Sequence, residues 1–125
     1  MRPAPAHYPQ RAPIDAYGNG GFRFAGMSHR GSLLVLPSGI YAWDVTSIHD
    51  VTAERCAAFL REVVPPGFVL LGTGRDHTCP SADVRKLYAE AGIGLEPMGT
   101  GAAARTFNVL LAEGRDVSAG LIAVE

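Results

Sequence analysis

The chain has 125 residues, a length that predicts a single domain in which roughly two-thirds of the unfolded chain's surface is buried on folding. Hydrophobic residues make up 47% of the chain and charged residues 18%, which is typical of a globular protein. A formal net charge of -1 argues against a nucleic-acid partner, and no apolar run approaches the ~20 residues that span a bilayer.

Cysteine usage indicates a reducing compartment. Cys56 and Cys79 form no CxxC pair and have no Cys or His partners at zinc-like spacing, so we expect two free thiols. The N-terminus lacks the apolar core of a secretory signal, which predicts a cytoplasmic protein. Arg2 and Arg11, with no acidic residue near them, resemble an organelle transit peptide, and a mitochondrial location is therefore the alternative.

Residues 1–13 are rich in proline and contain little besides Tyr8 that could pack. Proline removes backbone donors and favours extended, solvated chain, so we expect a disordered leader over residues 1–13. Residues 14–125 are then expected to form one α/β domain.

The first half of this domain contains short apolar segments separated by glycine-rich turns, a pattern that predicts strands. The expected strands are residues 14–17, 22–24, 31–36 and 40–43. The segment 31–36 is apolar on both faces, so it is expected to be central. Together these strands predict an antiparallel meander.

The apolar period changes to that of a helix after Thr52, which is a suitable N-cap. Apolar residues recur three and four positions apart as far as Val64, and Pro65-Pro66-Gly67 ends the pattern. The predicted helix places Cys56, Val63 and Val64 in its buried stripe, so Cys56 is expected to pack rather than react.

Strands and helices alternate in the C-terminal half. The expected elements are a strand at 68–71, a helix capped by Ser81, a short strand at 94–98, a helix at 102–113 and a last strand at 116–124. Pro97 is expected to confine the strand at 94–98 to an early finish or to an edge of the sheet. Such alternation predicts right-handed crossovers packed on a sheet. The predicted fold class is α/β: a single domain with a mixed β-sheet, in which an N-terminal antiparallel meander precedes βαβαβ-type parallel crossovers and helices pack on the sheet.

Two glycine loops follow strands, at the sheet end where open α/β proteins bind ligands. Gly72-Thr73-Gly74-Arg75 follows the strand at 68–71, and Gly99-Thr100-Gly101 opens a helix whose N-terminus suits an anion. Arg75 and Arg105 would complete such a site. The first loop lacks both the third glycine of GxGxxG and the lysine of a phosphate loop, so the alternative is that the glycines only permit tight turns.

The helix at 102–113 has few polar side chains, so we expect it to be mostly buried. Arg105 and Asn108 lie on one face. With Glu113 and Arg115 they form either a polar cluster facing a cleft or a buried network that fixes the helix on the sheet. The candidate ligand-binding residues are Gly72, Thr73, Gly74, Arg75, Thr100, Gly101, Arg105 and Asn108.

His77 and Cys79 lie in one predicted loop, where the imidazole would activate the thiol only if the two groups were in contact. The alternative is that their proximity is incidental, and we assign no catalytic residue. His29, His49 and His77 would form a metal site only by folding together, and no carboxylate-rich spacing supports one. No cofactor and no metal are predicted.

Short motifs follow one another over nearly the whole predicted domain. They are Tyr17-Gly18 with Gly21-Phe22, Gly31-Ser32-Leu33 with Trp43, Leu71-Gly72-Thr73-Gly74, Gly92-Ile93, Glu96 with Met98, Arg105-Thr106-Phe107-Asn108-Val109-Leu110 and Glu113-Gly114-Arg115. In these motifs the chain resembles the Mth-type domain family, which includes the adipogenesis-associated Mth-domain protein and an assembly factor of mitochondrial NADH:ubiquinone oxidoreductase (complex I). The resemblance implies a single α/β domain with a mixed sheet flanked by helices, and no established catalytic residues.

Two functions stay open at this point. The favoured one is a non-enzymatic accessory protein, assembly-factor-like, that acts through contacts with proteins such as membrane-complex subunits. It requires an exposed apolar patch, for which Trp43 and Tyr41 are the candidates. The alternative is a protein or enzyme that binds a small anionic ligand at the glycine loops with Arg75 and Arg105, and it requires a pocket that joins the two loops.

Overall fold

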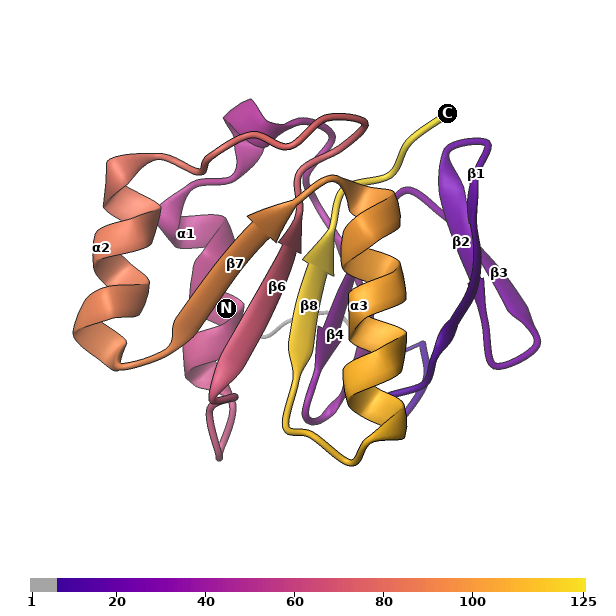
Figure 1. Cartoon of the computed structure of the whole chain (residues 1–125), viewed down its shortest axis with the longest axis horizontal. Coiled ribbons are helices and arrows are strands. Elements are labelled where there is room, and N and C mark those ends of the chain that lie inside the picture. Colours follow the sequence, from indigo (N-terminus) through magenta and orange to yellow (C-terminus); the bar gives the residue numbers. More distant parts are fainter. Residues whose placement is uncertain (1–6) are drawn as a thin grey trace.

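Figure 1 shows two β-sheets with helices packed against them, in a computed structural model that describes residues 7–125. β1 (Ile14–Gly18), β2 (Gly21–Phe24) and β3 (Met27–Arg30) form a three-stranded antiparallel sheet. The second sheet has five strands in the order β5-β4-β8-β6-β7. Its strands are β4 (Ser32–Leu36), β5 (Gly39–Trp43), β6 (Phe68–Gly72), β7 (Gly94–Met98) and β8 (Ser118–Leu121).

The five-stranded sheet is mixed, as predicted. β4 is antiparallel to its neighbours β5 and β8, whereas β6 is parallel to its neighbours β7 and β8. The predicted βαβαβ-type succession is confirmed by β6, β7 and β8 with the helices between them. The N-terminal strands are antiparallel, also as predicted, but they are divided between the two sheets.

A single residue, Gly31, separates β3 from β4 and so links the two sheets. Its φ angle is +96°, in the region that favours glycine, and its N–H donates to the Gly20 carbonyl at 2.7 Å. β3 itself was not predicted, because Met27-Ser28-His29-Arg30 lacks the apolar alternation that marks a strand.

The first predicted helix is shorter than expected. After the 3-10 turn η1 (Ile48–Asp50), α1 (Ala53–Cys56) continues as a second 3-10 helix, η2 (Ala57–Arg61). Glu62 then leaves the helical region with φ -66° and ψ 147°. Val63 and Val64, predicted to be buried, are 100% and 71% exposed. That prediction is wrong because the helical conformation ends at Arg61, before both valines, and Pro65 disfavours a helical conformation at Val64.

The other two helices begin and end close to the predicted residues. α2 (Ala82–Ala91) is capped by Ser81, whose Oγ accepts from the Val84 N–H at 3.4 Å. α3 (Thr100–Ala112) starts at the second glycine loop. The expectation that α3 is mostly buried is wrong: it lies on the sheet by one face only, and Val109 on the outer face is 57% exposed.

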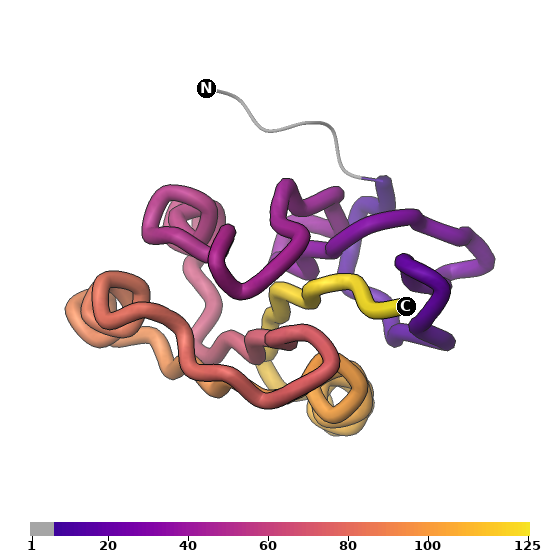
Figure 2. The backbone as a smooth tube through the Cα atoms, turned by 90° about the horizontal axis from the view of Figure 1, so that it is seen from above, coloured from indigo at the N-terminus to yellow at the C-terminus, as the bar shows by residue number. Residues whose placement is uncertain are grey.

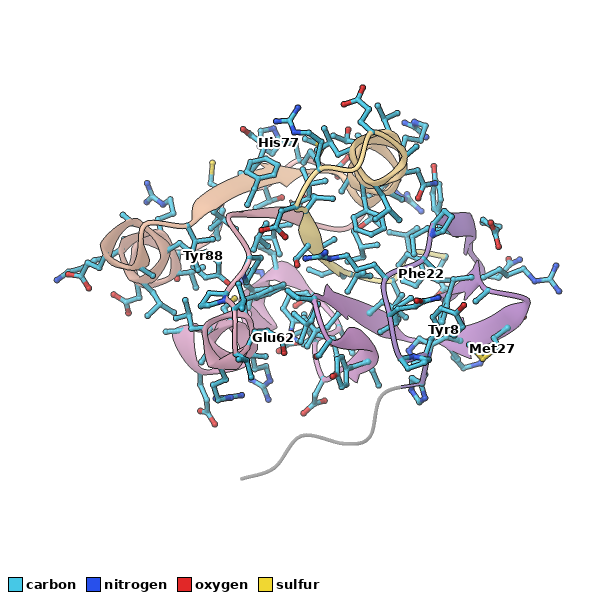
Figure 3. The ribbon with its side chains drawn as sticks, turned by 90° about the horizontal axis from the view of Figure 1, so that it is seen from below. Tyr8, Phe22, Met27, Glu62, His77 and Tyr88 are labelled. Atoms are coloured by element: carbon cyan, nitrogen blue, oxygen red, sulfur yellow. The ribbon has the colours of Figure 1, made fainter. Side chains whose placement is uncertain are left out.

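The five-stranded sheet has a hydrophobic core on each face. Along β4, Leu33 and Val35 belong to one core and Leu34 and Leu36 to the other, as expected for a central strand that is apolar on both sides. The first core lies under α3 and the three-stranded sheet, and the second under α1, η2 and α2. In Figure 3, Tyr8, Phe22 and Met27 lie at the three-stranded sheet beside the first core, while Tyr88, on α2, belongs to the second.

Residues 7–13 pack against the domain. The His7 N–H donates to the Ile40 carbonyl at 2.8 Å, and the Ile40 N–H donates to the Tyr8 carbonyl at 2.9 Å, so this segment lies along the edge of β5. Arg11 forms an ion pair with Asp116 at 2.7 Å, and Ala12 is buried. The disorder predicted for the leader is therefore wrong for residues 7–13. Its remaining part, residues 1–6, lies outside the described residues.

The backbone nitrogen of Pro97, on the edge strand β7, points away from the neighbouring strand β6. The Gly94 N–H donates to the Gly67 carbonyl at 3.1 Å and the Met98 carbonyl accepts from the Thr73 N–H at 2.8 Å, so positions 94 and 98 face β6. Because backbone groups alternate along a strand, Pro97 lies at an outward-facing position, where its missing N–H leaves the ladder intact. Of the two expectations for this strand, the edge position is confirmed, whereas the early finish is wrong because β7 continues to Met98.

Ala25 in the β2–β3 turn adopts a left-handed conformation that is unfavourable for alanine. Its φ is +50° and that of Gly26 is +75°, the pair of positive angles found in a type I′ hairpin turn. This conformation costs an alanine roughly 1–2 kcal/mol, and asparagine adopts it more readily. We expect Ala25→Asn to raise the free energy of unfolding, measured in urea, by about 0.5–1 kcal/mol. Ala25→Val should lower it, and a destabilised asparagine variant would contradict the assignment of strain.

Candidate functional site

Four strands end at the same edge of the five-stranded sheet. β5 and β8 are parallel to each other because β4 is antiparallel to both, and β8 is also parallel to β6 and through it to β7. Figure 1 shows the arrowheads of β6, β7 and β8 pointing to this edge. The segments that follow these strands, residues 44–52, 73–80, 99 and 122–125, therefore lie at one end of the domain. Ligands of open α/β sheets bind at such an edge.

A cavity of about 350 Å³ lies at this edge. Its lining comes from three of the segments: residues 46–49 after β5, Thr73, Gly74, Arg75, Asp76 and Thr78 after β6, and residues 122–125 after β8. Arg75 is exposed and supplies a positive charge to the lining, to which Asp76 and Glu125 add carboxylates, and the exposed His49 lines the same cavity. Three of the predicted ligand residues thus line one cavity.

The two glycine loops are joined by hydrogen bonds. The Thr100 N–H donates to the Gly74 carbonyl at 2.7 Å, and the Gly74 N–H donates to Thr100 Oγ1 at 3.0 Å. Thr100 Oγ1 in turn donates to the Ile122 carbonyl at 2.7 Å, which ties both loops to the end of β8. The Thr73 N–H is also engaged, with the Met98 carbonyl at 2.8 Å. These N–H groups pair within the protein, so an anion in the cavity would depend on Arg75.

The Thr73 side chain shapes the loop after β6. Its Oγ1 donates to the Asp76 carbonyl at 2.5 Å and accepts from the Thr78 N–H at 3.1 Å. Thr73 is buried, with 6% of its surface exposed. The hydroxyl therefore fixes the loop on which Arg75 stands.

Arg105 does not line the cavity of Arg75. It lines a separate hollow of about 340 Å³ between α3 and β1, together with Asn108 and residues 14–17. Its Nη1 donates to the Tyr17 hydroxyl at 3.2 Å. The same hydroxyl covers Gly101, where an added Cβ would lie 2.3 Å from it. The structure therefore brings Arg75 and Arg105 to two different sites.

Asn108 holds β1 on α3. The Ile14 N–H donates to Asn108 Oδ1 and Asn108 Nδ2 donates to the Ile14 carbonyl, both at 2.8 Å. The side-chain amide thus pairs with the backbone as a neighbouring strand would. Glu113 and Arg115 pair with each other at 4.0 Å on the exposed surface. Two arrangements were predicted for this polar group, a cluster that faces a cleft and a network that fixes the helix. The bonds of Asn108 agree with the second.

Cys79 lines a second cavity, of about 370 Å³, with His49, Thr78 and Asp83. His77, the predicted partner of Cys79, is not part of this lining. The histidine that shares a cavity with the Cys79 thiol is therefore His49, which lines both cavities of this edge. Cys79 itself is free and exposed.

Cys56 is a packing residue, as predicted. It is free and buried, and burial raises the pKa of its thiol to about 11. The Tyr88 hydroxyl donates to the Cys56 carbonyl at 3.0 Å, and burial raises the pKa of this phenol far above its ordinary value. Neither group is suited to proton transfer or nucleophilic attack near neutral pH.

The segment that brings His49 to the cavity was not singled out from the sequence. Asp50 Oδ2 accepts from the Thr46 N–H at 2.9 Å and from Thr46 Oγ1 at 2.8 Å. These bonds, with another from the Ser47 N–H, lower the pKa of the Asp50 carboxyl. The available signal was Ser47 followed three residues later by an acidic residue, the pattern of a capping box.

Within residues 7–125, no group of three or more His, Cys, Asp or Glu side chains is arranged to hold a metal ion. The described helices are also too short or too polar to cross a membrane.

These features define an α/β domain with a mixed sheet whose parallel strands end beside an open cavity. The chain belongs to the family described as "Protein of unknown function (DUF498/DUF598)", which matches residues 14–122. The match covers both sheets and all the helices.

Two relatives illustrate the range of the family. An uncharacterized protein of Rhodobacter capsulatus is 37% identical over 98% of this chain and 93% of its own length. The mouse protein named NADH dehydrogenase [ubiquinone] 1 alpha subcomplex assembly factor 3 is 32% identical over 94% of this chain. The match spans 63% of the mouse protein.

Solved structures agree with the fold. A Bartonella henselae protein, described as an outer membrane protein, is 53% identical with a TM-score of 0.91 over 95% of this chain and 100% of that chain. A Bordetella pertussis protein, described as a Mth938-like domain, is 28% identical with a TM-score of 0.74 over 98% of this chain and 90% of that chain. The predicted resemblance to the Mth-type family, including the complex I assembly factor, is confirmed.

Proposed function

We propose that this protein is a non-enzymatic accessory protein of the assembly-factor type, which acts through contacts with other proteins. The observation that supports this most is the similarity to the mouse assembly factor over 94% of the chain. The proposed partners are subunits of a membrane-bound NADH dehydrogenase.

The predicted contact residues need revision. Trp43 is buried, with 6% of its surface exposed, and its Nε1 donates to the Arg55 carbonyl at 3.0 Å. Tyr41 is half-buried and its hydroxyl pairs with Ser38 Oγ. Trp43 and Tyr41 therefore do not form an exposed patch. The exposed apolar side chains instead include Val63 and Val64, in the loop that projects before β6 at the bottom of Figure 1.

The loop with Val63 and Val64 is held at both ends. Ser38 donates to the Glu62 carboxylate from its N–H at 2.8 Å and from its Oγ at 2.9 Å. At the other end, the Gly67 N–H donates to Asp116 Oδ2 at 3.3 Å. Two prolines between these anchors restrict the backbone further. A partner that buries the two valines would therefore lose little loop entropy on binding.

Affinity purification from the source organism tests this proposal. The tagged protein is compared with a Val63→Ser/Val64→Ser double variant and with Val109→Ser, which removes an exposed valine on α3. Burying one valine contributes about 1.5 kcal/mol or more, so we expect the double variant to recover at least about tenfold less NADH dehydrogenase subunit. Val109→Ser should recover as much as the wild type. Absence of these subunits from the wild-type sample would contradict the proposed function.

A second candidate function is the binding of a small anionic ligand in the cavity beside Arg75. The observation in its favour is the lining of that cavity, which combines Thr73, Gly74 and Arg75 at the carboxyl ends of parallel strands. Mass spectrometry of small molecules released from the purified protein tests it. A stoichiometric anion retained by the wild type and by Arg105→Ala, but lost from Arg75→Ala, would support this function. No bound anion in any sample would count against it.

A further inference from the structure

The three-stranded sheet has one face in the core and one face open. Phe22 and Phe24 on β2 are buried in the first core, and Arg23 between them is exposed. Because side chains alternate along a strand, Arg23 marks the outer face, which no element of the described chain covers in Figure 1. A cavity of about 390 Å³ lies over these three strands.

The strand register identifies the side chains that share the outer face. Arg23 pairs with Ala16 on β1 and Ser28 on β3, and two residues along Gly21 pairs with Gly18 and Arg30. Arg23 and Arg30 are therefore diagonal neighbours, a placement that separates their backbones by roughly 7–8 Å. Two guanidinium groups at this spacing can approach one oxyanion from opposite sides.

The floor between the two arginines consists of small residues. Gly21 must be glycine, because an added Cβ would lie 2.1 Å from the His29 carbonyl oxygen. Ala16 and Gly18 extend this floor on β1. The low floor leaves the cavity open between the longer side chains, and its volume falls in the range of roughly 300–1,000 Å³ of small-molecule sites.

The charge of this face is not balanced within the described residues. Neither Arg23 nor Arg30 takes part in an ion pair there. Arg23 Nε donates to Ser28 Oγ at 3.2 Å, which orients the guanidinium along the sheet and leaves its terminal nitrogens available. The two rows of paired residues contain no carboxylate, so an external anion would offset the repulsion between the arginines.

Glu125 is an acidic side chain at one end of this face. The chain after β8 crosses to the β1–β2 turn, where the Gly20 N–H donates to the Val124 carbonyl at 2.8 Å (Figure 2). A Cβ added to Gly20 would lie 3.4 Å from Glu125 Oε2 and 3.8 Å from Arg30 Nη1. The Glu125 carboxylate thus lies at the rim of the cavity, where it would compete with an incoming anion for Arg30.

We propose that the outer face of the three-stranded sheet binds a small molecule through a phosphate or carboxylate group held between Arg23 and Arg30. This site is separate from the cavity of Arg75 and does not depend on the proposed assembly function.

Nuclear magnetic resonance of the ¹⁵N-labelled protein tests the site, with inorganic phosphate and succinate as probes at constant ionic strength. We expect saturable shifts of the Gly18, Gly21, Arg23, Ser28 and Arg30 amides with at least one probe. Saturation by phosphate alone identifies a phosphate site, and saturation by succinate a carboxylate site.

Three variants make the experiment decisive. The Arg23→Ala/Arg30→Ala double variant should bind at least about tenfold more weakly, since it lacks both charge-assisted contacts. Arg85→Ala, which removes an exposed arginine on α2, should bind as the wild type does. Glu125→Gln should bind about twofold more tightly, because a competing carboxylate is lost. Shifts that do not saturate, that centre on Arg75, or that persist in the double variant would overturn the proposal. All the substituted side chains are exposed, and the wild-type titration maps the site independently of them.

Discussion

Thr100→Val is expected to lower the free energy of unfolding by about 2–4 kcal/mol, measured by urea denaturation. Thr100 is fully buried, and its hydroxyl accepts from the Gly74 N–H and donates to the Ile122 carbonyl. Valine preserves the shape of the side chain but removes both bonds. The cost follows from leaving a buried donor and a buried acceptor without partners.

Two control variants separate the hydroxyl from the packing of this residue. Thr100→Ser keeps the oxygen and loses one methyl group, so it should cost only about 1 kcal/mol. Thr106→Val removes a hydroxyl from the same helix whose contact is a weaker one, to Met98 Sδ at 3.6 Å, and should change stability by less than about 1 kcal/mol. Equal losses in Thr100→Val and Thr100→Ser would show that the hydroxyl does not join the loops.

Gly120→Ala is expected to destabilise the domain by about 2–3 kcal/mol through overpacking. Gly120 lies on β8, between β4 and β6, and a Cβ there would be 2.9 Å from both Cη2 and Cζ3 of Trp43. Phe59 Cζ would be 3.4 Å away. The indole cannot retreat without breaking its bond to the Arg55 carbonyl, and the middle strand is held on both sides.

Gly67→Ala provides the matched control for Gly120→Ala. Its nearest neighbour would be Asp116 Oδ2 at 3.8 Å, an ordinary contact. Stability should therefore change by less than about 0.5 kcal/mol or increase slightly, because alanine restricts the unfolded chain. A Gly120→Ala variant as stable as Gly67→Ala would contradict the packing of Trp43 on β8.

Local patterns in the sequence were sufficient for most of the fold. The alternation after residue 68 predicted the parallel strands and their helices, and Pro97 predicted the edge strand. The patterns failed where a neighbouring residue overrode the period, as at Val64 before Pro65. They also failed at β3, where polar residues form a strand because β2 pairs with them.

The candidate site was predictable in position but not in composition. The run that ends at Gly72 indicated an edge of the sheet at which Thr73, Gly74 and Arg75 line a cavity. The position of Arg105 depends on contacts with Tyr17, 88 residues away in the chain, and no local pattern carries that information. Asn108 was predicted either to face a cleft or to join a network that fixes the helix, and the choice depends on its partner Ile14, which is 94 residues away.

The strand edges of both sheets are partly covered, which affects how readily the protein aggregates at high concentration. β5 is covered at Ile40 by residues 7 and 8, β7 presents Pro97, and the start of β1 is occupied by the Asn108 amide. An open strand edge is a template for pairing with another chain, and these three edges are each interrupted. The remaining edge, β3, has only four residues. These interruptions hinder edge-to-edge pairing between copies of the domain at high concentration.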